Sequence, residues 1–418
     1  MNIEACLKAY KWQFAICISL FVFTLVACNE NDSHAKQDSK PHTNSSLVLG
    51  IEQPNLYLPL LDGKKVGLVV NQTSMFEKQH LVDFLIQQKI DVRVMFAPEH
   101  GVRGNKGAGE HIDSGKDSKT GVAIQSIYGT NKTPPNDLMS QLDVVIFDIQ
   151  DVGTRFYTYI SSMHYMMEAA AKHELTFIVL DRPNPNGKYV DGPVLDLAFQ
   201  SFVGMHPIPV LHGLSVAELA LMIKGEGWIK QANKLDLHTI AMQNYAKSMP
   251  YELPIAPSPN LPNAQAIQLY PSLCFFEATA LSVGRGTDFP FQVIGHNVIK
   301  LGDFTFTPVS KPNAAPKPKL QDTRLFGQDL RSAKIGGLDL RLLVDSYKGF
   351  SGSGETFFTH PEFMDKLAGT DQLRLAIEAG KTVDEIKANW QADLDAYKQM
   401  RQQYLLYPQL GPINAKYQ

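Results

Sequence analysis

Residues 143–159 have the sequence Asp-Val-Val-Ile-Phe-Asp-Ile-Gln-Asp-Val-Gly-Thr-Arg-Phe-Tyr-Thr-Tyr, and this stretch decides the fold. The apolar run 144–147 is typical of a strand that is covered on both faces in a parallel sheet. Polar side chains follow immediately, at Asp148, Gln150, Asp151 and Arg155. Because ligands bind beyond the carboxyl ends of such strands, this position predicts a site. The alternative is that the two acids cap the next helix and pair with Arg155.

The same order of strand and helix recurs on both sides of this stretch. Strands are expected at 66–70, 92–96 and 176–180, and helices at 77–89 and 157–173. A repeated strand–helix unit predicts an α/β fold with a doubly wound parallel sheet, because right-handed crossovers place helices on both faces. Ser215 and Glu218 have the spacing of a capping box, which predicts a further helix to about residue 224.

The pattern changes beyond Trp228. Short strands are expected at 235–240, 273–276 and 338–343, an exposed loop rich in proline and lysine at 311–319, and helices at 371–378 and 383–404. This change predicts a first α/β domain over 49–228 and a second, smaller α+β domain over 229–418.

The N-terminus has the features of a lipoprotein signal. Lys8 and Lys11 precede the apolar run 14–27, which ends in Leu-Val-Ala and then Cys28. We expect cleavage of residues 1–27 and lipidation of Cys28; the alternative is an ordinary signal peptide cut nearby. Residues 28–48 are polar and are expected to form a disordered tether. Asn29 is not the aspartate that marks inner-membrane retention, so we expect an envelope lipoprotein on the outer membrane, facing the periplasm.

Composition restricts the class of protein to which the chain can belong. The chain has 418 residues, of which 44% are hydrophobic and 19% charged, so it can bury a sizeable core. A formal net charge of -3 gives no electrostatic reason to expect a nucleic-acid partner, which usually requires a basic face. Of its four cysteines, only Cys274 would remain as a free thiol after cleavage and lipidation, so no internal disulfide is expected.

Carboxylates follow several predicted strands. Glu99 follows the strand 92–96, and Glu277 follows the strand expected at 273–276. A carboxyl group near apolar walls and other carboxylates can act as a general acid near neutral pH. The structural alternative is that Glu99 binds nearby backbone amides while His100 packs.

Two loops could present further polar groups. Residues 256–262 form a proline-rich loop that carries Ser258 and Asn260, although such loops are more often connectors. Arg285 lies between two glycines, where a backbone can approach a ligand closely; it could bind a substrate carboxylate or pair internally with Glu277.

No metal or cofactor is expected. The histidines lack zinc spacing, and the chain has neither a nucleophile elbow nor a phosphate-binding glycine loop. A crevice lined by acids, arginines and aromatic residues is instead typical of a carbohydrate site, because aromatic rings stack on sugar faces and acids act on the glycosidic bond.

Six ordered blocks resemble the exo-β-N-acetylmuramidase family of bacterial glycoside hydrolases, formerly a domain of unknown function. They extend from about Leu49 to the C-terminus and are residues 71–74 (Asn-Gln-Thr-Ser), 97–104 (Ala-Pro-Glu-His-Gly-Val-Arg-Gly), 147–159, 180–185 (Leu-Asp-Arg-Pro-Asn-Pro), 257–260 (Pro-Ser-Pro-Asn) and 284–287 (Gly-Arg-Gly-Thr). Ala97 departs from the glycine expected there.

The resemblance implies a Rossmann-like N-terminal domain, a smaller C-terminal domain and a site between them. The implied activity is release of N-acetylmuramic acid from the non-reducing end of peptidoglycan fragments. Glu99 would be the general acid, Glu277 or Asp151 its partner, and Arg155 or Arg285 the ligand of the lactyl carboxylate. Further candidates for substrate contacts are Asn71, His100, Arg103, Asp148, Gln150, Tyr157, Arg182, His212, Ser258 and Asn260.

Three alternatives stay open. A metal-dependent hydrolase would use Asp148, Asp151 and histidines as ligands. A muropeptide-binding lipoprotein without catalysis would keep the aromatic residues and arginines. A structural lipoprotein would leave the acids at the strand ends unexplained. The sequence does not decide between retention and inversion, and it does not fix the oligomeric state.

Overall fold

The computed structural model describes residues 46–104 and 114–410. The expected signal peptide, the lipidation site Cys28 and the tether up to residue 45 lie outside these residues.

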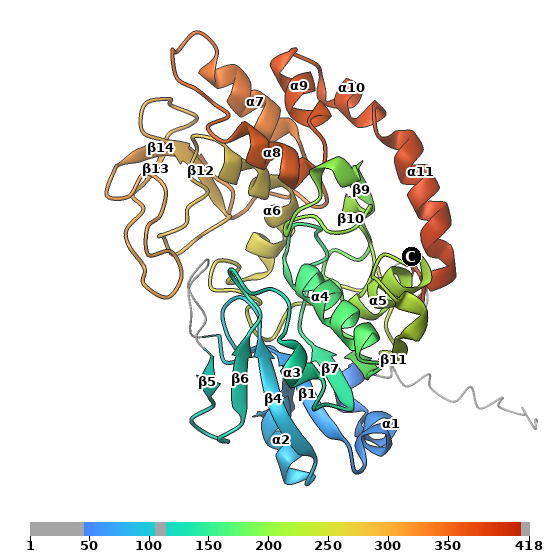
Figure 1. Ribbon diagram of the computed structural model, residues 1–418. Coiled ribbons are helices and arrows are strands. Elements are labelled where there is room, and N and C mark those ends of the chain that lie inside the picture. Colours follow the sequence, from blue (N-terminus) through green and yellow to red (C-terminus); the bar gives the residue numbers. More distant parts are fainter. Residues whose placement is uncertain (1–45, 105–113, 411–418) are drawn as a thin grey trace, which may run out of the picture. The chain divides into compact units, whose positions relative to one another are not determined.

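A central sheet is formed by β1 (Lys65–Val70), β4 (Asp91–Ala97), β5 (Gly115–Lys116), β6 (Ala123–Ser126), β7 (Val144–Asp148), β8 (Thr176–Leu180) and β11 (Asp236–Ile240). Within the described residues the sheet has seven strands in the order β11-β8-β7-β1-β4-β6-β5 (Figure 1). Neighbouring strands are parallel, except that β5 is antiparallel to β6. The predicted Rossmann-like α/β class is confirmed.

The chain reverses its direction of travel across this sheet next to β1. It passes from β1 to β4 and β6 on one side, and then returns to β7 on the other side of β1. Val70 at the end of β1 is in register with Asp148 at the end of β7. In open α/β sheets such a switch point opens a crevice at the carboxyl ends of the strands. Asn71 and Asp151 therefore lie where this topology favours a ligand.

The helices of the sheet-bearing part are α1 (Pro54–Tyr57), α2 (Leu81–Gln87), α3 (Asn136–Met139), α4 (Tyr159–Lys172) and α5 (Val216–Gly225). Leu68 and Ile146 face the side covered by α2, whereas Val69 and Phe147 face the side covered by α4 and α5. This alternation follows from the two-residue period of a strand. Figure 1 shows α4 and α5 side by side on their face.

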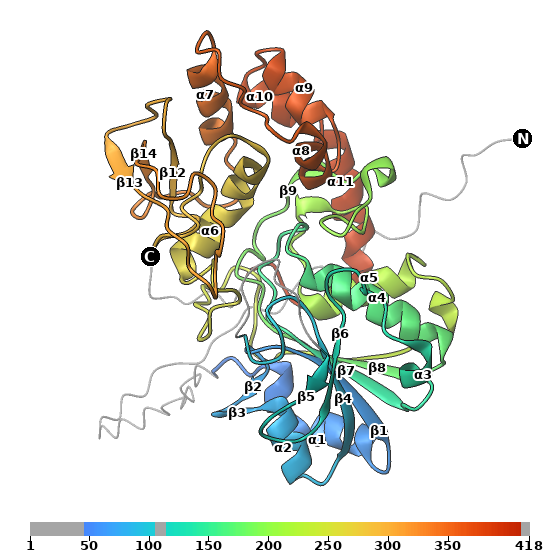
Figure 2. The same ribbon diagram turned by 60° about the vertical axis from the view of Figure 1, so that its left-hand side comes forward.

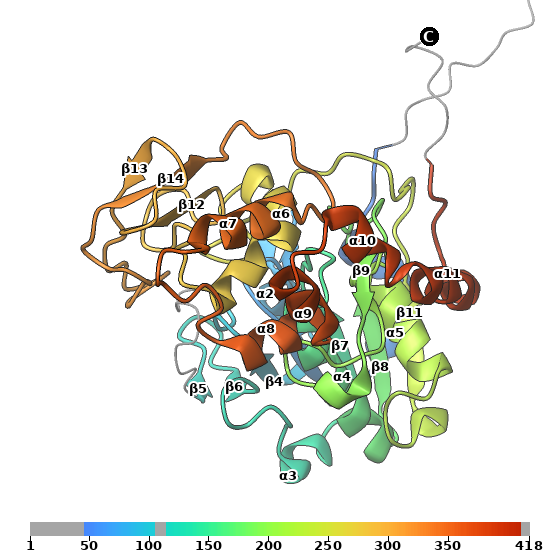
Figure 3. The ribbon, with the colours of Figure 1, turned by 90° about the horizontal axis from the view of Figure 1, so that it is seen from above.

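The remaining strands form small antiparallel sheets. They are β2 (Met75–Phe76) with β3 (Gln79–His80), β9 (Asp191–Val194) with β10 (Pro209–Leu211), and β12 (Val293–His296), β14 (Leu325–Asp329) and β13 (Phe304–Phe306) in that order. The C-terminal helices are α6 (Ala264–Leu273), α7 (Arg341–Phe350), α8 (Pro361–Ala368), α9 (Gln372–Glu378), α10 (Val383–Ala388) and α11 (Gln391–Met400). Figure 2 shows β12, β13 and β14 together, and Figure 3 shows α8 beside α9.

Short 3₁₀-helices complete the fold: η1 (Gly50–Glu52), η2 (Leu58–Leu61), η3 (Leu197–Phe199), η4 (Ala232–Lys234), η5 (Cys274–Ala278) and η6 (Arg401–Tyr404). No helix of the described residues is both long enough and apolar enough to span a bilayer.

One hydrophobic core joins the two parts of the chain. It contains Phe147 of the central sheet, Leu269 of α6 and Met364 of α8. Moreover, β11 pairs with β8, so the sheet continues beyond Trp228. The expected boundary between residues 228 and 229 therefore falls within the sheet-bearing part of the chain.

Four expected elements differ in the structure. The single helix expected at 383–404 is divided into α10, α11 and η6. Residues 273–276 are helical. The Asn263 side chain caps α6 by accepting a hydrogen bond from Ala266 N, and α6 continues directly into η5. The strand expected at 338–343 is wrong as well, since α7 begins at Arg341. The helix expected from residue 77 begins at Leu81, because residues 75–80 form the β2–β3 hairpin.

Candidate functional site

A tight turn after β4 carries Glu99. The Gly101 amide donates to the Pro98 carbonyl at 3.0 Å, and His100 and Gly101 have φ angles of 71° and 76°. A non-glycine residue in this left-handed region stores strain of about 1–3 kcal/mol, and such residues cluster at functional sites. His100 is buried, whereas Glu99 is half-buried. The turn thus leaves the Glu99 carboxylate at the carboxyl edge of the sheet.

Hydroxyl groups from two neighbouring elements hold this carboxylate. Tyr128, just after β6, donates to Oε1 of Glu99 at 2.8 Å, and Thr158, just before α4, donates to Oε2 at 3.2 Å. The Tyr159 hydroxyl lies 3.4 Å from the Glu99 carbonyl oxygen. Hydrogen bonds to a charged carboxylate are stronger than those between neutral groups, so they fix its orientation.

An aromatic cluster joins the sheet edge to α6. Tyr157 and Tyr159 meet edge to face with ring centroids 5.0 Å apart, and Tyr157 meets Tyr270 of α6 at 5.9 Å. The Tyr157 hydroxyl donates to the Pro257 carbonyl at 2.9 Å. Gln72, which follows β1, donates to the same carbonyl at 3.1 Å. The proline-rich loop is therefore bonded directly to the edge that carries Glu99.

Glu277 and Arg285 form a bidentate ion pair. The two hydrogen bonds measure 2.9 and 3.0 Å, and the side chains are 27% and 26% exposed. The Arg285 guanidinium also lies 4.9 Å from the centroid of the Phe291 ring. This is the internal pair that the sequence left open as an alternative.

Tyr128 links this pair to Glu99. Burial and the Glu99 carboxylate raise the pKa of Tyr128, while the positive charge of Arg285 acts in the opposite direction. Arg285 is thus close enough to Tyr128 for their electrostatic interaction to matter. Tyr128 is therefore hydrogen-bonded to Glu99 and interacts electrostatically with Arg285, the partner of Glu277.

Asp151 is a buried carboxyl group beside the same aromatic cluster. Its Oδ1 accepts a hydrogen bond from Gly153 N at 2.6 Å, and 6% of the residue is exposed. Burial raises the pKa of Asp151 to about 7. Burial also raises the pKa of Tyr159, and the charges of Glu99 and Asp151 both add to that rise.

Two other candidates pair with internal acids. Arg182 binds Asp148 with hydrogen bonds of 2.6 and 3.0 Å, and both side chains are buried. Arg103 binds Asp117 at 2.9 and 2.8 Å, and these hydrogen bonds hold the pKa of Asp117 well below its usual range. Asp148 is thus in an internal ion pair, but its partner is Arg182 and not Arg155, which the sequence offered as the alternative.

Arg155 is completely buried and binds backbone carbonyls. Nη1 donates to Pro193 and Ile208 at 2.7 Å each, and Nη2 donates to Leu367 and Ala368 at 2.9 and 2.6 Å. Burial lowers the pKa of Arg155 to about 9. Its guanidinium therefore ties the chain around β9 and β10 to the end of α8, rather than facing a ligand.

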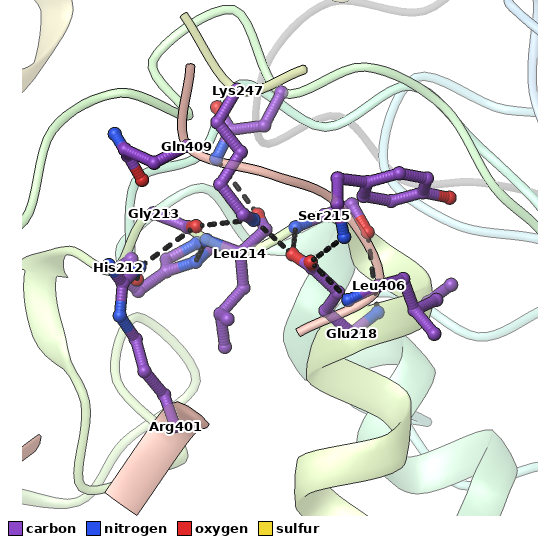
Figure 4. Close-up of polar contacts among 12 residues, drawn as sticks. His212, Gly213, Leu214, Ser215, Glu218, Lys247, Arg401, Leu406 and Gln409 are labelled. Atoms are coloured by element: carbon purple, nitrogen blue, oxygen red, sulfur yellow. Dashed lines mark hydrogen bonds and ion pairs between the residues drawn. The ribbon is translucent and has the colours of Figure 1, made fainter. Parts of the chain in front are cut away.

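His212 lies in a buried network near α5 (Figure 4). Its Nδ1 accepts from Leu214 N at 3.2 Å, and its carbonyl accepts from the Tyr397 hydroxyl at 2.7 Å. Burial lowers the pKa of His212 to about 3, so the ring is neutral at pH 7. The ion pair of Glu218 and Lys247 lies beside it, and Lys247 also donates to the Gly213 carbonyl at 2.8 Å.

Gln150 and Ser258 also make internal hydrogen bonds. Gln150 donates to the carbonyls of Asp151 and Pro183 at 2.8 and 2.7 Å. Ser258 Oγ accepts from Asn260 N at 3.1 Å. Both side chains thus stabilise loops near the carboxyl edge of the sheet.

Some candidates retain buried polar atoms that have no hydrogen-bond partner among the described residues. These atoms are Nδ2 of Asn71, Oδ2 of Asp151, Nε of Arg155, Nε2 of His212 and Oδ1 of Asn260. A buried polar atom without a partner costs about 1–3 kcal/mol, so each calls for an ordered water or a ligand. Nδ2 of Asn71 and Oδ2 of Asp151 are two such atoms, and both residues lie at the carboxyl edge of the sheet.

The sequence did not single out Tyr128, Thr158 or Tyr159 as contacts of Glu99. Tyr128 follows β6, a strand too short and too polar to be predicted. Thr158 and Tyr159 adjoin Tyr157 and lie between the end of a strand and the start of a helix. That position was the signal that could have identified them as site residues. No group of three or more His, Cys, Asp or Glu residues in 46–104 and 114–410 has the placement of a metal site.

Comparisons with known proteins agree on one family. Residues 66–265 match the model "Exo-beta-N-acetylmuramidase NamZ, N-terminal", and residues 268–407 match "Exo-beta-N-acetylmuramidase NamZ, C-terminal". The chain is 35% identical to the peptidoglycan beta-N-acetylmuramidase NamZ of Bacillus subtilis (strain 168), with 95% of this chain and 100% of that protein covered.

Two solved structures of DUF1343 family proteins from Bacteroides fragilis NCTC 9343 are also similar. The first is 41% identical with a TM-score of 0.78, covering 88% of this chain and 100% of that one. The second is 26% identical with a TM-score of 0.75, covering 86% and 99%.

Proposed function

The chain belongs to the exo-beta-N-acetylmuramidase NamZ family of glycosidases, and on that premise we propose that it releases N-acetylmuramic acid from the non-reducing end of peptidoglycan fragments. The named activity of the Bacillus subtilis relative supports this substrate. The observation that carries the proposal is the Glu99 carboxyl group, oriented by Tyr128 and Thr158 at the carboxyl edge of the sheet. The proposed reaction requires no cofactor.

Glu99 is the proposed general acid. It would protonate the glycosidic oxygen as the bond to the anomeric carbon breaks, so that the remaining sugar leaves as a neutral alcohol. A carboxyl group must be held within hydrogen-bonding reach of that oxygen to be effective. The hydroxyl groups of Tyr128 and Thr158 supply that orientation.

Glu277 is the proposed partner carboxylate. Two hydrogen bonds from Arg285 hold the Glu277 carboxyl group in place, and a base or a nucleophile needs such a fixed position. Asp151, whose pKa is about 7, would be largely protonated below neutral pH, which does not suit that role. Asp151 is therefore assigned to the wall of the crevice.

Arg285 is the proposed ligand of the lactyl carboxylate that distinguishes muramic acid from glucosamine. Its side chain is 26% exposed, whereas Arg155 is completely buried and binds four carbonyl groups. A guanidinium can bind a carboxylate through two parallel hydrogen bonds. On binding, the lactyl group would share Arg285 with Glu277.

The test is incubation with two isomeric disaccharides. We expect release of free N-acetylmuramic acid when that sugar is at the non-reducing end, and none when it is at the reducing end. Activity that a chelator abolishes would support a metal-dependent hydrolase instead. Binding of the first disaccharide without release of a monosaccharide would support a non-catalytic muropeptide-binding protein.

The same incubation decides the stereochemistry. The anomer first formed, followed by NMR, reports retention or inversion of configuration. Retention is expected if the two carboxyl groups lie about 5 Å apart, and inversion if about 7–9 Å separates them.

We further propose that the protein is an envelope lipoprotein anchored through Cys28, because the apolar run 14–27 ends in Leu-Val-Ala directly before that cysteine. Metabolic labelling with a fatty acid tests this proposal. We expect label in the wild type and none in Cys28→Ser; equal labelling of both would contradict it.

A further inference from the structure

The loop 309–319 lies against the segments that carry the proposed site. The sequence predicted residues 311–319 of this loop to be exposed, yet Pro318 is buried and Lys319 is half-buried. Val309 N donates to the Gly286 carbonyl at 3.0 Å, and Asn260 Nδ2 donates to the Ala314 carbonyl at 2.8 Å. The loop therefore contacts both the Arg285 turn and the proline-rich loop.

Gly286 permits this close approach. Its φ is 83°, and a Cβ atom there would lie 2.5 Å from the Val309 carbonyl oxygen and 2.7 Å from Cγ of Pro318. Only glycine fits both the backbone conformation and the space. The turn that carries Arg285 is thus shaped by the loop packed on it.

Lys319 binds the end of η5, the 3₁₀-helix that carries Glu277. Its Nζ donates to the carbonyl oxygens of Phe276 at 3.1 Å and Glu277 at 3.3 Å, and also to that of Thr279. The last carbonyl groups of a helix lack partners within it, and a cation there both satisfies them and complements the helix dipole. One ammonium group thereby fixes the last turn around Glu277.

We propose that Lys319 is a positioning residue of the glycosidase site, holding Glu277 and its partner Arg285 in place from the loop 309–319. This inference rests on the proposed function, which assigns Glu277 and Arg285 to that site. Lys319 does not contact the reacting atoms in this proposal. It acts because a displacement of about 1 Å in a reacting group can cost 10²-fold in rate.

The test compares Lys319→Met with Lys317→Met, an exposed lysine of the same loop. We expect Lys319→Met to lower kcat for N-acetylmuramic acid release at least tenfold, with KM changed less than threefold. Lys317→Met should keep the wild-type constants. Lys319→Arg keeps a cation that can bind several carbonyl groups, so it should retain most of kcat.

The division of the effect between kcat and KM separates positioning from a general structural role. A smaller folded fraction lowers the apparent kcat of every variant in proportion to the unfolded protein, whereas a misplaced Glu277 lowers kcat in protein that is fully folded. Circular dichroism and thermal unfolding of Lys319→Met measure the folded fraction.

Two outcomes would overturn the inference. The first is wild-type kcat in Lys319→Met. The second is a loss of activity explained entirely by a smaller folded fraction, with no rescue by Lys319→Arg. A wild-type protein that releases no N-acetylmuramic acid would refute the proposed function itself, so the two failures are distinguishable.

Discussion

The Tyr128 hydroxyl donates a 2.8 Å hydrogen bond to Oε1 of Glu99, joining the residue after β6 to the turn after β4. The two strands are parallel neighbours, and Ala97 is in register with Ser126. Their carboxyl ends therefore meet at the same edge, and the tyrosine orients the acid from the side.

Replacing Tyr128 with phenylalanine tests this relationship. The Tyr128→Phe variant should keep the fold and lose about 10-fold to 100-fold in kcat, because the Glu99 carboxyl group loses its shorter side-chain hydrogen bond. Tyr165→Phe on α4 is a control for loss of a tyrosine hydroxyl elsewhere. Steady-state kinetics with the disaccharide measure both, and equal kcat for Tyr128→Phe and wild type would remove the tyrosine from the mechanism.

Asp151 should make stability depend on pH. Its pKa rises from 3.8 to about 7 on folding, so the native state holds a proton that the unfolded state releases between these values. This contribution to the free energy of unfolding is complete below about pH 4 and is lost as pH rises to about 7, in total about 4 kcal/mol. Asp151→Asn cannot titrate, so its stability relative to wild type should increase over this range.

Urea unfolding at pH 5 and pH 8 measures that difference. All other titrating groups are shared, so they largely cancel between variant and wild type. A difference in unfolding free energy that is the same at both pH values would contradict the burial of an ionisable Asp151.

Arg155 should matter for stability rather than for substrate binding. Arg155→Lys retains the charge but cannot reach all four carbonyl groups, so we expect a loss of about 3 kcal/mol or more. Arg331→Lys, in an exposed pair with Asp329, should leave stability nearly unchanged. A stable Arg155→Lys variant with a greatly raised KM would instead place Arg155 against the substrate.

The buried pair of Glu218 and Lys247 should be essential to the fold (Figure 4). The Glu218 carboxylate also accepts hydrogen bonds from Ser215 N and Leu406 N, each at 2.8 Å. Glu218→Gln would leave a buried ammonium without its counter-ion, which costs about 3–5 kcal/mol. Thermal unfolding measures the change, and Glu218→Gln with wild-type stability would contradict it.

Much of the central sheet was predictable because its strands are buried on both faces. Apolar runs predicted β1, β7 and β8, because a strand covered on both faces is apolar throughout. β4 was predicted as well, although the exposed Arg93 lies within it. The sequence missed β6, whose residues Ala123–Ser126 are short and mostly half-buried. Apolar run length alone also failed at 273–276, where a buried helix and a buried strand look alike.

The acid of the site was predictable, but most of its surroundings were not. Glu99 follows a recognisable strand, and the order of strands fixes which loops share an edge. Whether Arg155 faces a ligand or backbone carbonyls depends on α8, more than two hundred residues away in the chain. The residues near Arg155 in the sequence do not indicate a contact with α8. The sequence therefore could not decide between a ligand contact and an internal contact for Arg155.

The most direct test of general acid catalysis by Glu99 is the dependence of rate on the leaving group. The variant Glu99→Gln is assayed with the disaccharide and with a dinitrophenyl muramide, whose leaving group needs no proton. Glu362→Gln, an exposed glutamate of α8, is the matched control. We expect Glu99→Gln to lose at least 10³-fold on the disaccharide but less than tenfold in bond cleavage on the aryl muramide. Equal losses on both substrates, or near-full activity on the disaccharide, would contradict the role of Glu99 as general acid.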